Sequence, residues 1–238
     1  ASDVYKRQIR LHVSDLPGVG EGFAVSEGQA HYLANVMRLG EGDTIRVFNG
    51  EAGEWRARIA KISRKAATLE PTRQTRAPAP EPDAWLCFAL LKRQKTDLVV
   101  EKATELGVSA IQPIITARTN ADHVNLERLR AIATEAAEQC ERLHVPEIRA
   151  PLPVMKLMAA WPAARPLCIA DERRDAALLG PASGPSALMV GPEGGFTDQE
   201  LEAIARTPII TRVSLGSRIL RAETAAIAGL ALQLAAQP

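Results

Sequence analysis

Up to residue 70, the hydrophobic pattern is that of short strands. Residues 9–13 (IRLHV) alternate between apolar and polar positions, which predicts a strand with one buried face. Residues 44–50 (TIRVFNG) end in an Asn-Gly turn signal, and together with 54–63 (EWRARIAKIS) they predict a β-hairpin. Residues 66–70 (AATLE) form one further strand. The pattern predicts a small, strand-rich domain with the form of a barrel.

One helix interrupts these strands. Ser26 and Gln29 have the spacing of a capping box, in which two side chains satisfy the free amides at a helix start. They predict a helix over 28–38, and Gly40 follows it as glycine often does at helix ends. The expected apolar face of this helix consists of Leu33, Val36 and Met37.

The composition changes at residue 71. The stretch 71–84 (PTRQTRAPAPEPDA) contains four prolines and few apolar residues, which is typical of a linker because proline stiffens the chain and removes backbone donors. We therefore assign residues 9–71 to a first domain, 72–84 to a linker and 85–238 to a second domain.

The second domain alternates between apolar strands and amphipathic helices. Strands are expected over 86–91, 110–115, 167–171, 187–191 and 209–216. Helices are expected over 94–106, from Asn125 to about 142, from Thr197 onward, and over 222–236. This alternation predicts an α/β fold with a parallel sheet and helices on both faces. Ligands of such sheets bind beyond the carboxyl ends of the strands.

Composition limits the class of protein. Hydrophobic residues make up 46% of the 238 residues and charged residues 24%, as in ordinary globular proteins. No apolar run approaches the roughly 20 residues of a membrane span. The three cysteines lie far apart in apolar or helical stretches, which favours buried free thiols and a reducing, cytoplasmic location. No CxxC pair occurs and the histidines are scattered, so we expect no metal site.

The net charge of +1 neither requires nor excludes a nucleic-acid partner. Basic residues are concentrated in the first domain, at Arg10, Arg38, Arg46, Arg56, Arg58, Lys61, Arg64 and Lys65. Solvated strand edges and a phosphate-binding surface explain this concentration equally well. Residues 1–8 differ in character from the strand that follows, and we assign them no structural role.

The most informative segment is 188–200 (LMVGPEGGFTDQE). A buried strand leads directly into Gly191, Gly194 and Gly195, and a Thr197–Glu200 capping box then begins a helix. Glycines at the carboxyl end of a strand allow the backbone to approach a ligand closely. A tight strand-to-helix turn explains the same glycines. The patterns of nucleotide-binding loops, GxxxxGK[ST] and GxGxxG, are absent.

A second strand-to-helix segment covers 213–227 (VSLGSRILRAETAAI). Gly216 is followed by Arg218, Arg221 and Glu223. Two such turns on neighbouring strands would line one pocket, where arginines can bind phosphate or stabilise developing negative charge. The alternative is that Arg221 and Glu223 are surface residues at a helix start.

In their order and spacing, GPEGGFTDQE and LGSRILRAETA resemble the RsmE family of 16S ribosomal RNA uridine N3-methyltransferases, members of the SPOUT superfamily. The resemblance extends to HYLANVMRLGEGD (31–43), KRQKTDLVVEKATELGVSAIQPI (92–114), ART (117–119) and EAAEQCER (135–142). Thr119 and Cys140 stand where the family more usually has serine. Both lie outside the two glycine-bearing turns.

The resemblance implies an N-terminal PUA-like RNA-binding barrel and a C-terminal domain with a deep trefoil knot. It also implies S-adenosylmethionine as the cofactor, a homodimer in which both chains contribute to a site, and uridine 1498 of the small-subunit rRNA as the substrate. The final helix, apolar around much of its circumference, fits a dimer interface as well as a core.

The resemblance also assigns candidate site residues. The cofactor residues are Leu188, Val190, Gly191, Glu193, Gly194, Gly195, Leu215, Gly216, Ser217, Ile219, Leu220 and Ala222. We expect Arg221 and Arg218 to stabilise charge on the uracil, and Glu223 or Glu193 to accept its proton. The candidate RNA contacts are Arg10, Arg38, Lys92, Arg93 and Arg118. A solvated helix start is an equally good interpretation of Lys92 and Arg93.

Three other functions are alternatives to this one. One is a SPOUT methyltransferase acting on another RNA, such as transfer RNA. Another is a non-catalytic RNA-binding assembly factor, against which the two intact cofactor segments argue. A phosphate-loop nucleotidase fails because its lysine is missing.

Overall fold

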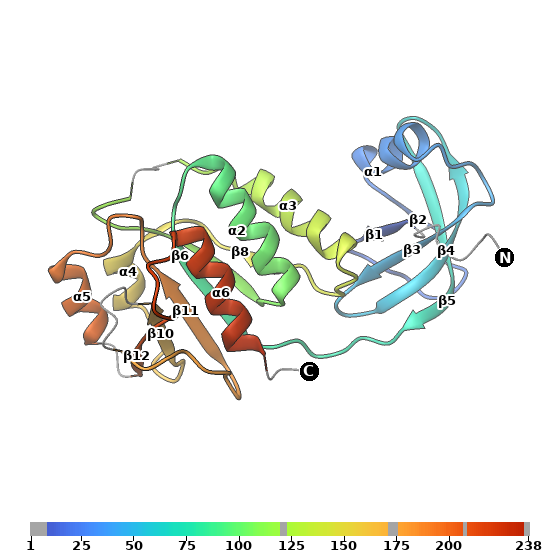
Figure 1. Ribbon diagram of the computed structural model, residues 1–238. Helices are drawn as coiled ribbons and strands as arrows, with labels where there is room; N and C mark the ends of the chain where they lie inside the picture. Colours follow the sequence, from blue (N-terminus) through green and yellow to red (C-terminus); the bar gives the residue numbers. More distant parts are fainter. Residues whose placement is uncertain (1–8, 120–122, 171–175, 207–208, 236–238) are drawn as a thin grey trace. The chain divides into compact units, whose positions relative to one another are not determined.

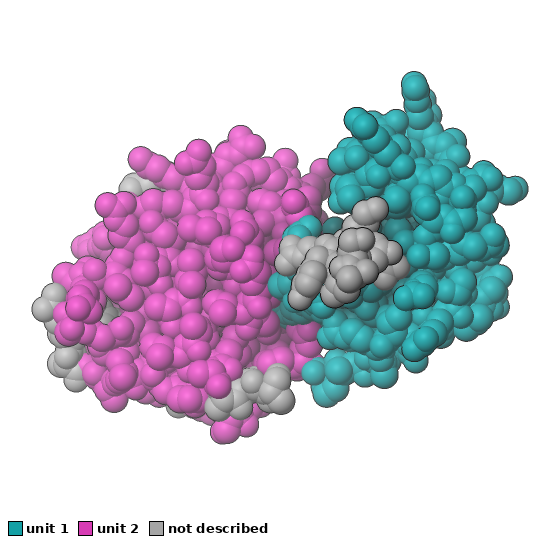
Figure 2. Space-filling model, turned by 45° about the vertical axis from the view of Figure 1, so that its right-hand side comes forward, with its two compact units in different colours: residues 1–80, 137–145 teal, residues 81–136, 146–238 magenta. Residues whose placement is uncertain are grey.

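The computed structural model describes residues 9–119, 123–170, 176–206 and 209–235 (Figure 1). The chain divides into two compact units, shown in different colours in Figure 2. Unit 1 consists of residues 1–80 and 137–145, and unit 2 consists of 81–136 and 146–238. The first unit therefore includes a short segment from the middle of the chain, which the sequence-based division did not contain.

Unit 1 is built on a five-stranded sheet with the order β1-β3-β4-β5-β2. Its elements are β1 (Arg10–His12), β2 (Phe23–Ala24), α1 (Glu27–His31), the π-helical turn η1 (Tyr32–Val36), β3 (Thr44–Asn49), β4 (Gly53–Ile62) and β5 (Ala67–Arg76). The predicted hairpin is confirmed, since β3 and β4 pair in antiparallel register. Strands β1 and β3 are parallel.

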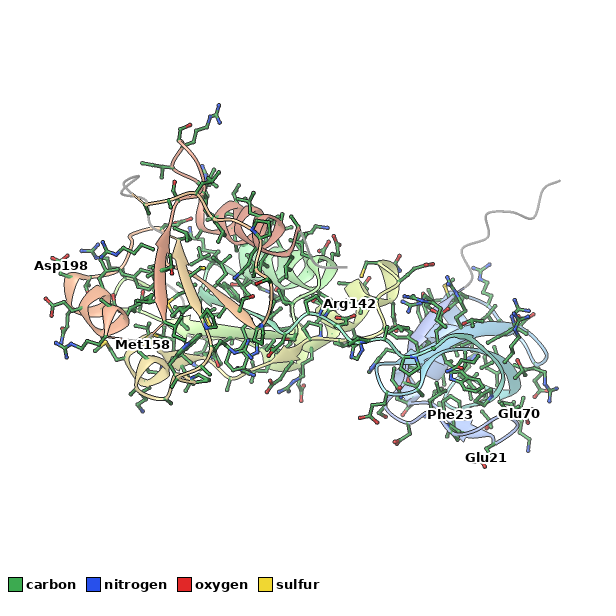
Figure 3. The ribbon with its side chains drawn as sticks, turned by 90° about the horizontal axis from the view of Figure 1, so that it is seen from below. Glu21, Phe23, Glu70, Arg142, Met158 and Asp198 are labelled. Carbon is green, nitrogen blue, oxygen red and sulfur yellow. The ribbon has the colours of Figure 1, made fainter. Side chains whose placement is uncertain are left out.

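The sheet of unit 1 surrounds an apolar core. Three register shifts between β4 and β5 bend the long hairpin, because each extra residue increases the local twist. Strand β2 adds to β5 through the pair Phe23–Leu69, and Figure 3 shows Phe23 beside the labelled Glu21 and Glu70. Leu33 of η1 packs against this core. The strand-rich first domain is therefore confirmed.

The predicted helix over 28–38 is correct at its start and wrong in its face. The capping box of Ser26 and Gln29 is present. After His31 the helix continues as one π turn, which changes the direction of the side chains that follow. Leu33 is buried, but Val36 and Met37 are 59% and 36% exposed.

The predicted linker, 72–84, is shorter in the structure. Strand β5 continues to Arg76, and strand β6 of unit 2 begins at Ala84. The hydroxyls of Thr72 and Thr75 donate to the main-chain oxygens of Arg56 and Glu54, at 2.9 and 3.0 Å. These bonds hold the end of β5 against β4, within the proline-containing stretch that the sequence assigned to the linker.

A buried ion pair joins β1 to β4 inside unit 1. Arg10 Nε lies 2.6 Å from Glu54 Oε2, and both side chains are at most 2% exposed. The same guanidinium donates to the main-chain oxygens of Ala137, Glu138 and Arg142 (labelled in Figure 3) and stacks on a phenylalanine ring. Arg10 therefore attaches segment 137–145 to the sheet.

Unit 2 alternates strands and helices. Its elements are β6 (Ala84–Ala89), α2 (Arg93–Leu106), β7 (Ala110–Ile115), α3 (Leu126–Gln139, whose last residues belong to unit 1), β8 (Glu147–Ile148), β9 (Leu152–Pro153), α4 (Val154–Ala159), β10 (Leu167–Ala170), β11 (Ser186–Val190), α5 (Asp198–Ala205), β12 (Ile210–Val213) and α6 (Ala222–Leu234).

The strands of unit 2 form a sheet in the order β12-β10-β11-β6-β7-β8, with β9 also paired to β7. Each of these pairings is parallel, which confirms the predicted α/β fold. Helix α2 ends at Gly107, whose φ of 98° lies in the left-handed region. Helix α3 begins after Asn125 as expected but ends at Gln139.

Helices cover both faces of this sheet. Cys87 and Met189 share a core cluster with Val154 of α4 and Ile204 of α5. Figure 3 shows α4 and α5 near one another through the labelled Met158 and Asp198. On the other face, α6 packs against β11 and α2. The contact with β11 is close, because a Cβ added at Gly229 would lie 2.6 Å from Leu188 Cδ2.

The three cysteines are free, as expected, but they are not all buried. Cys87 is buried in β6, and desolvation raises the pKa of its thiol to about 12. Cys168 is half-buried, and Cys140 is exposed because α3 ends one residue before it.

We predict that replacing Arg10 by methionine destabilises the protein strongly. The variant Arg10→Met keeps much of the side-chain volume but removes the closest cation of the buried Glu54, which keeps only Arg46, 3.5 Å from its other carboxylate oxygen. Removing one partner of a buried ion pair costs about 3 kcal/mol. Urea unfolding of the full chain measures the loss. The control is Arg58→Met, which breaks an exposed pair with Glu70 and should cost less than about 1 kcal/mol. Equal losses in the two variants would contradict the assignment of Arg10 as a structural residue.

Candidate functional site

The first segment of the site connects β11 to α5. The chain turns at Gly195, which has a φ of 70° and donates its amide to Pro192 at 2.9 Å. Helix α5 begins with the predicted capping box, because Thr197 and Glu200 each accept a bond from the other's amide, at 3.2 and 2.8 Å. Glu200 is buried, and its second oxygen accepts the amide of Ala117 at 2.7 Å. The capping residue thus also holds the segment that follows β7.

The second segment connects β12 to α6. Gly216 has a φ of 118°, which strongly favours glycine, and its amide donates to Ser214 Oγ at 3.2 Å. Helix α6 begins after Arg221, whose extended backbone forms the cap without a side-chain hydrogen bond. The Arg221 guanidinium is therefore not used for capping the helix.

The two segments line one cavity of about 120 Å³. Its lining consists of Ile169, Ala170, Val190, Gly191, Pro192, Gly195, Phe196, Leu201, Leu215, Gly216, Arg218, Ile219, Leu220 and Ala225. Most of these side chains are apolar or absent, and Arg218 supplies a charge. An apolar pocket with few polar groups is typical of sites for small organic ligands.

The structure brings most of the sequence-predicted cofactor residues to this cavity. Those that line it are Val190, Gly191, Gly195, Leu215, Gly216, Ile219 and Leu220. Leu188, Glu193, Gly194, Ser217 and Ala222 do not. Leu188 packs against α6 instead, and Ala222 is buried in the first turn of that helix.

Sequence reasoning missed part of the lining. These residues are Ile169, Ala170, Pro192, Phe196, Leu201 and Ala225. Ile169 and Ala170 end β10, which lies between β11 and β12 in the sheet. The strand order was the missing information, because the chain alone does not tell which strand end lies between the two segments.

The Phe196 ring leaves no space for a side chain at position 191. A Cβ at position 191 would lie 2.7 Å from the edge of the Phe196 ring, closer than two carbon atoms approach. The ring therefore lies directly against the backbone of Gly191, and both residues line the cavity. A larger residue at 191 would displace part of the cavity wall.

Arg118 supports the first segment from the loop after β7. Its guanidinium donates to the main-chain oxygen of Gly194 at 2.7 Å, and its aliphatic carbons lie beside the position that a Gly194 Cβ would take. Arg118 was predicted as an RNA contact. It is exposed, but one of its donors is used within the protein.

Lys95 of α2 connects the two segments. Its ammonium group forms an ion pair with Glu193 of the first segment and lies 3.3 Å from Glu223 Oε1 in α6. The hydrogen bond with Glu193 raises the pKa of Lys95. Glu223 Oε2 is buried without a hydrogen-bond partner among the residues that the structure describes. Lys95 is not among the site residues that the sequence predicts.

Of the two predicted proton acceptors, Glu193 is disfavoured. The hydrogen bond from Lys95 lowers the pKa of this carboxyl, and the charges of Lys95 and Arg221 act in the same direction. Glu193 is also exposed, so burial does not hold its pKa above the ordinary value. Glu223 is partly buried, with one free carboxylate oxygen, and remains the better candidate.

The predicted RNA contacts separate into two groups. Arg10 is wrong as an RNA contact, because its guanidinium is buried and held by Glu54 and three carbonyl oxygens. Arg38, Lys92, Arg93 and Arg118 are exposed. Arg38 has a φ of 55°, uncommon for a residue other than glycine, at the end of the π turn.

Within the described ranges, no cluster of three or more His, Cys, Asp or Glu side chains is arranged to hold a metal ion. No helix in the same ranges is long and apolar enough to cross a membrane.

We predict that Lys95→Met raises the pKa of Glu193 toward its ordinary value. A lowered pKa means that ionised Glu193 stabilises the folded state above its ordinary pKa. That contribution is lost as the pH falls through the lowered value. Without Lys95 this pH dependence should become weaker, because only the smaller effects of Arg221 and Lys92 remain. An NMR titration that follows the carboxyl carbon of Glu193 measures this pKa. In the control, Lys102→Met, a lysine that pairs with Glu101 and Glu105 of the same helix is removed, and Glu193 should not respond. An unchanged Glu193 titration in Lys95→Met would refute the ion pair.

Comparisons with known proteins agree with this architecture. A family model described as the RNA methyltransferase domain matches residues 78–234, and one described as the RNA methyltransferase PUA domain matches residues 25–72. The chain is 36% identical over 210 residues to the ribosomal RNA small subunit methyltransferase E of Rickettsia conorii, which covers 87% of this chain and 86% of that protein.

The protein of the same name from Synechocystis is 37% identical over 243 residues, covering 97% of this chain and 78% of the relative. A crystal structure of the ribosomal RNA small subunit methyltransferase E from Neisseria gonorrhoeae, bound to S-adenosyl methionine, has a TM-score of 0.86 and 28% identity, covering 96% and 97% of the two chains. This chain therefore belongs to the RNA methyltransferase family that includes the ribosomal RNA small subunit methyltransferases E.

Proposed function

We propose that this chain transfers a methyl group from S-adenosylmethionine to N3 of uridine 1498 in 16S rRNA of the small ribosomal subunit. The observation that carries the proposal is the cavity lined by both glycine-bearing segments, in a chain of this family. The similar protein from Neisseria gonorrhoeae has S-adenosyl methionine bound in its crystal structure. The choice of uridine N3 comes from the resemblance of GPEGGFTDQE and LGSRILRAETA to the RsmE family.

The residues of the cavity fit this cofactor. Ile219, Leu220 and Leu215 offer aliphatic surface for an adenine ring, and the glycines at 191 and 195 let the main chain itself form part of the cavity wall. The close contact of Phe196 with Gly191 gives this wall a fixed shape. When bound, S-adenosylmethionine supplies an electrophilic methyl group.

The protein side chains must make uridine N3 a nucleophile. N3 carries a proton at neutral pH, so the site has to accept that proton or stabilise the resulting anion. Arg218 lines the cavity and Arg221 begins α6 beside it, so both can direct positive charge toward a uracil oxygen. Glu223 Oε2 is a buried acceptor without a partner in the described parts of the chain, which suits it to receive the proton.

Lys95 has a positioning role in this scheme. It holds Glu223 by one carboxylate oxygen, so that the other oxygen points away from the ion pair. It holds Glu193 at the same time, which ties the first segment to the start of α6. One ammonium group therefore holds the first segment and the start of α6 together.

The remaining family properties complete the proposal. We infer that the enzyme acts in the cytoplasm as a homodimer, that its α/β unit is a SPOUT domain with a trefoil knot, and that the first unit binds RNA. Ile227 and Leu232 of α6 are apolar but only half-buried. This partial exposure supports the inference that α6 contributes to a subunit interface.

The central test is mass spectrometry of small-subunit rRNA after incubation with enzyme and cofactor. We expect a single methyl group on N3 of the target uridine. In Arg221→Ala, transfer should fall about 100- to 1000-fold because one charge-stabilising donor is lost, while cofactor affinity stays nearly unchanged. Arg206→Ala, at the exposed end of α5, is the control. Full turnover in Arg221→Ala would refute the role of Arg221 in stabilising charge. Methylation of a different RNA would show that 16S rRNA is not the substrate.

A second prediction concerns the cofactor wall. Gly191→Ala should weaken S-adenosylmethionine binding about tenfold, because the added Cβ displaces the Phe196 ring. Isothermal titration calorimetry measures the affinity. Gly180→Ala is the matched control, since a Cβ there meets no atom within 4 Å. Equal affinities in the two variants would exclude Gly191 from the binding wall. If the unmodified protein failed to bind the cofactor, a non-catalytic assembly factor would be the better function.

A further inference from the structure

A second hollow, of about 270 Å³, lies at the starts of α2 and α3 in unit 2. We refer to it as the α2–α3 hollow. Its lining consists of Leu90, Leu91, Arg93, Thr96, Asp97, His123, Val124, Asn125 and Arg128. None of these residues lines the cofactor cavity, so the two are separate sites.

The charges of the hollow favour an anion. Arg128 pairs with one carboxylate oxygen of Asp97. Arg93 is exposed and forms no ion pair with any residue that the structure describes. Two 14-residue helices begin at the hollow, because α2 starts after Lys92 and α3 after Asn125, and Arg93 and Asn125 are lining residues. The Asn125 side chain accepts the amide of Arg128 at 3.0 Å, so that amide of α3 is already used. Free amides at helix starts add to the attraction for negative charge.

The hollow also contains a polar acceptor and an apolar wall. Asp97 Oδ1 is buried without a partner in the described ranges, so it can accept a hydrogen bond from a hydroxyl or amine of a ligand. Leu90 and Leu91 are buried, and Thr96 is fixed by bonds of 3.2 and 2.9 Å to the main chain of Leu91. A rigid apolar wall next to charged groups suits a ribose or a base attached to a phosphate.

A small depression, of about 30 Å³, shares lining residues with both the hollow and the cofactor cavity. Its lining includes Leu90 and Leu91, which also line the hollow, and Pro192, which also lines the cofactor cavity. Lys92, Arg118 and Glu193 also line this depression, and the Glu193 carboxylate is paired with Lys95. A nucleic-acid strand that follows it from the cofactor cavity to the hollow would pass two positive charges and one carboxylate that is already neutralised by an ion pair.

We propose that the α2–α3 hollow binds a nucleotide of the rRNA strand next to the target uridine. The proposal rests on the proposed methyltransferase function. The reacting base must reach the cofactor cavity, so the nucleotide in a separate hollow is a neighbour in the strand. Arg93 and Arg128 contact its phosphate, and Asp97 Oδ1 accepts a hydrogen bond from its ribose hydroxyl, a group that DNA lacks.

The test compares Arg93→Gln with Arg130→Gln, using an RNA oligonucleotide of the small-subunit rRNA that contains the target uridine. Arg130 is exposed on α3 but does not line the hollow. In Arg93→Gln we expect a rise in KM for RNA of about tenfold, because a charge-assisted bond is lost, with kcat and cofactor affinity unchanged. The slope of log affinity against log salt should decrease by about 0.7. Arg130→Gln should change neither quantity.

Single phosphates of the oligonucleotide are then replaced, one at a time, by neutral methylphosphonate. At one position beside the target uridine, the replacement should weaken binding to the unmodified protein but not weaken binding to Arg93→Gln further. Absence of such a position, or equal KM values for Arg93→Gln and Arg130→Gln, would overturn the proposal.

The binding measurements separate this proposal from the proposed function. The unmodified protein could transfer no methyl group to the RNA while Arg93→Gln still lost the contact with one phosphate. In that case the hollow would be confirmed as an RNA-binding site and the proposed methylation would be wrong. If methyl transfer were normal and Arg93→Gln had no effect, only the hollow would be excluded.

Discussion

The candidate site depends on one constraint, which is that neighbouring strands of unit 2 run in the same direction. Because β10, β11 and β12 are parallel, their carboxyl ends meet at one edge, and the loops that leave them share one cavity. The loops after β6 and β7 leave the same edge, so Lys95 and Arg118 reach the same region from different parts of the chain. In an antiparallel arrangement, alternate loops would lie at opposite ends of the sheet.

Charge has two different uses in this protein. In unit 1, the Arg10–Glu54 pair is buried, so each charge needs the other and cannot serve a ligand. In unit 2, Lys95 is only partly buried, and its two carboxylate partners belong to the loop after β11 and to the first turn of α6. The first arrangement stabilises a fold, and the second fixes the relative positions of loops while leaving Glu223 Oε2 available.

Local sequence signals predicted the secondary structure well, and the residues that failed depend on distant partners. The capping boxes at Ser26 and Thr197 were correct because each is complete within four residues. The roles of Arg10 and Lys95 were missed because their partners lie more than 40 residues away along the chain. The family resemblance supplied the cofactor segments, of which the cavity includes a majority, but neither resemblance nor periodicity indicated Phe196 or the end of β10.

The contact between Gly229 and Leu188 has a consequence for how this sequence can change. Helix α6 lies so close to β11 that a single methyl group at position 229 would meet the leucine side chain. The two positions therefore share one fixed volume, and a larger residue at 229 is compatible only with a smaller one at 188. In related chains we expect these positions to co-vary in size, since the spacing between helix and strand also sets the position of Leu215 at the cavity.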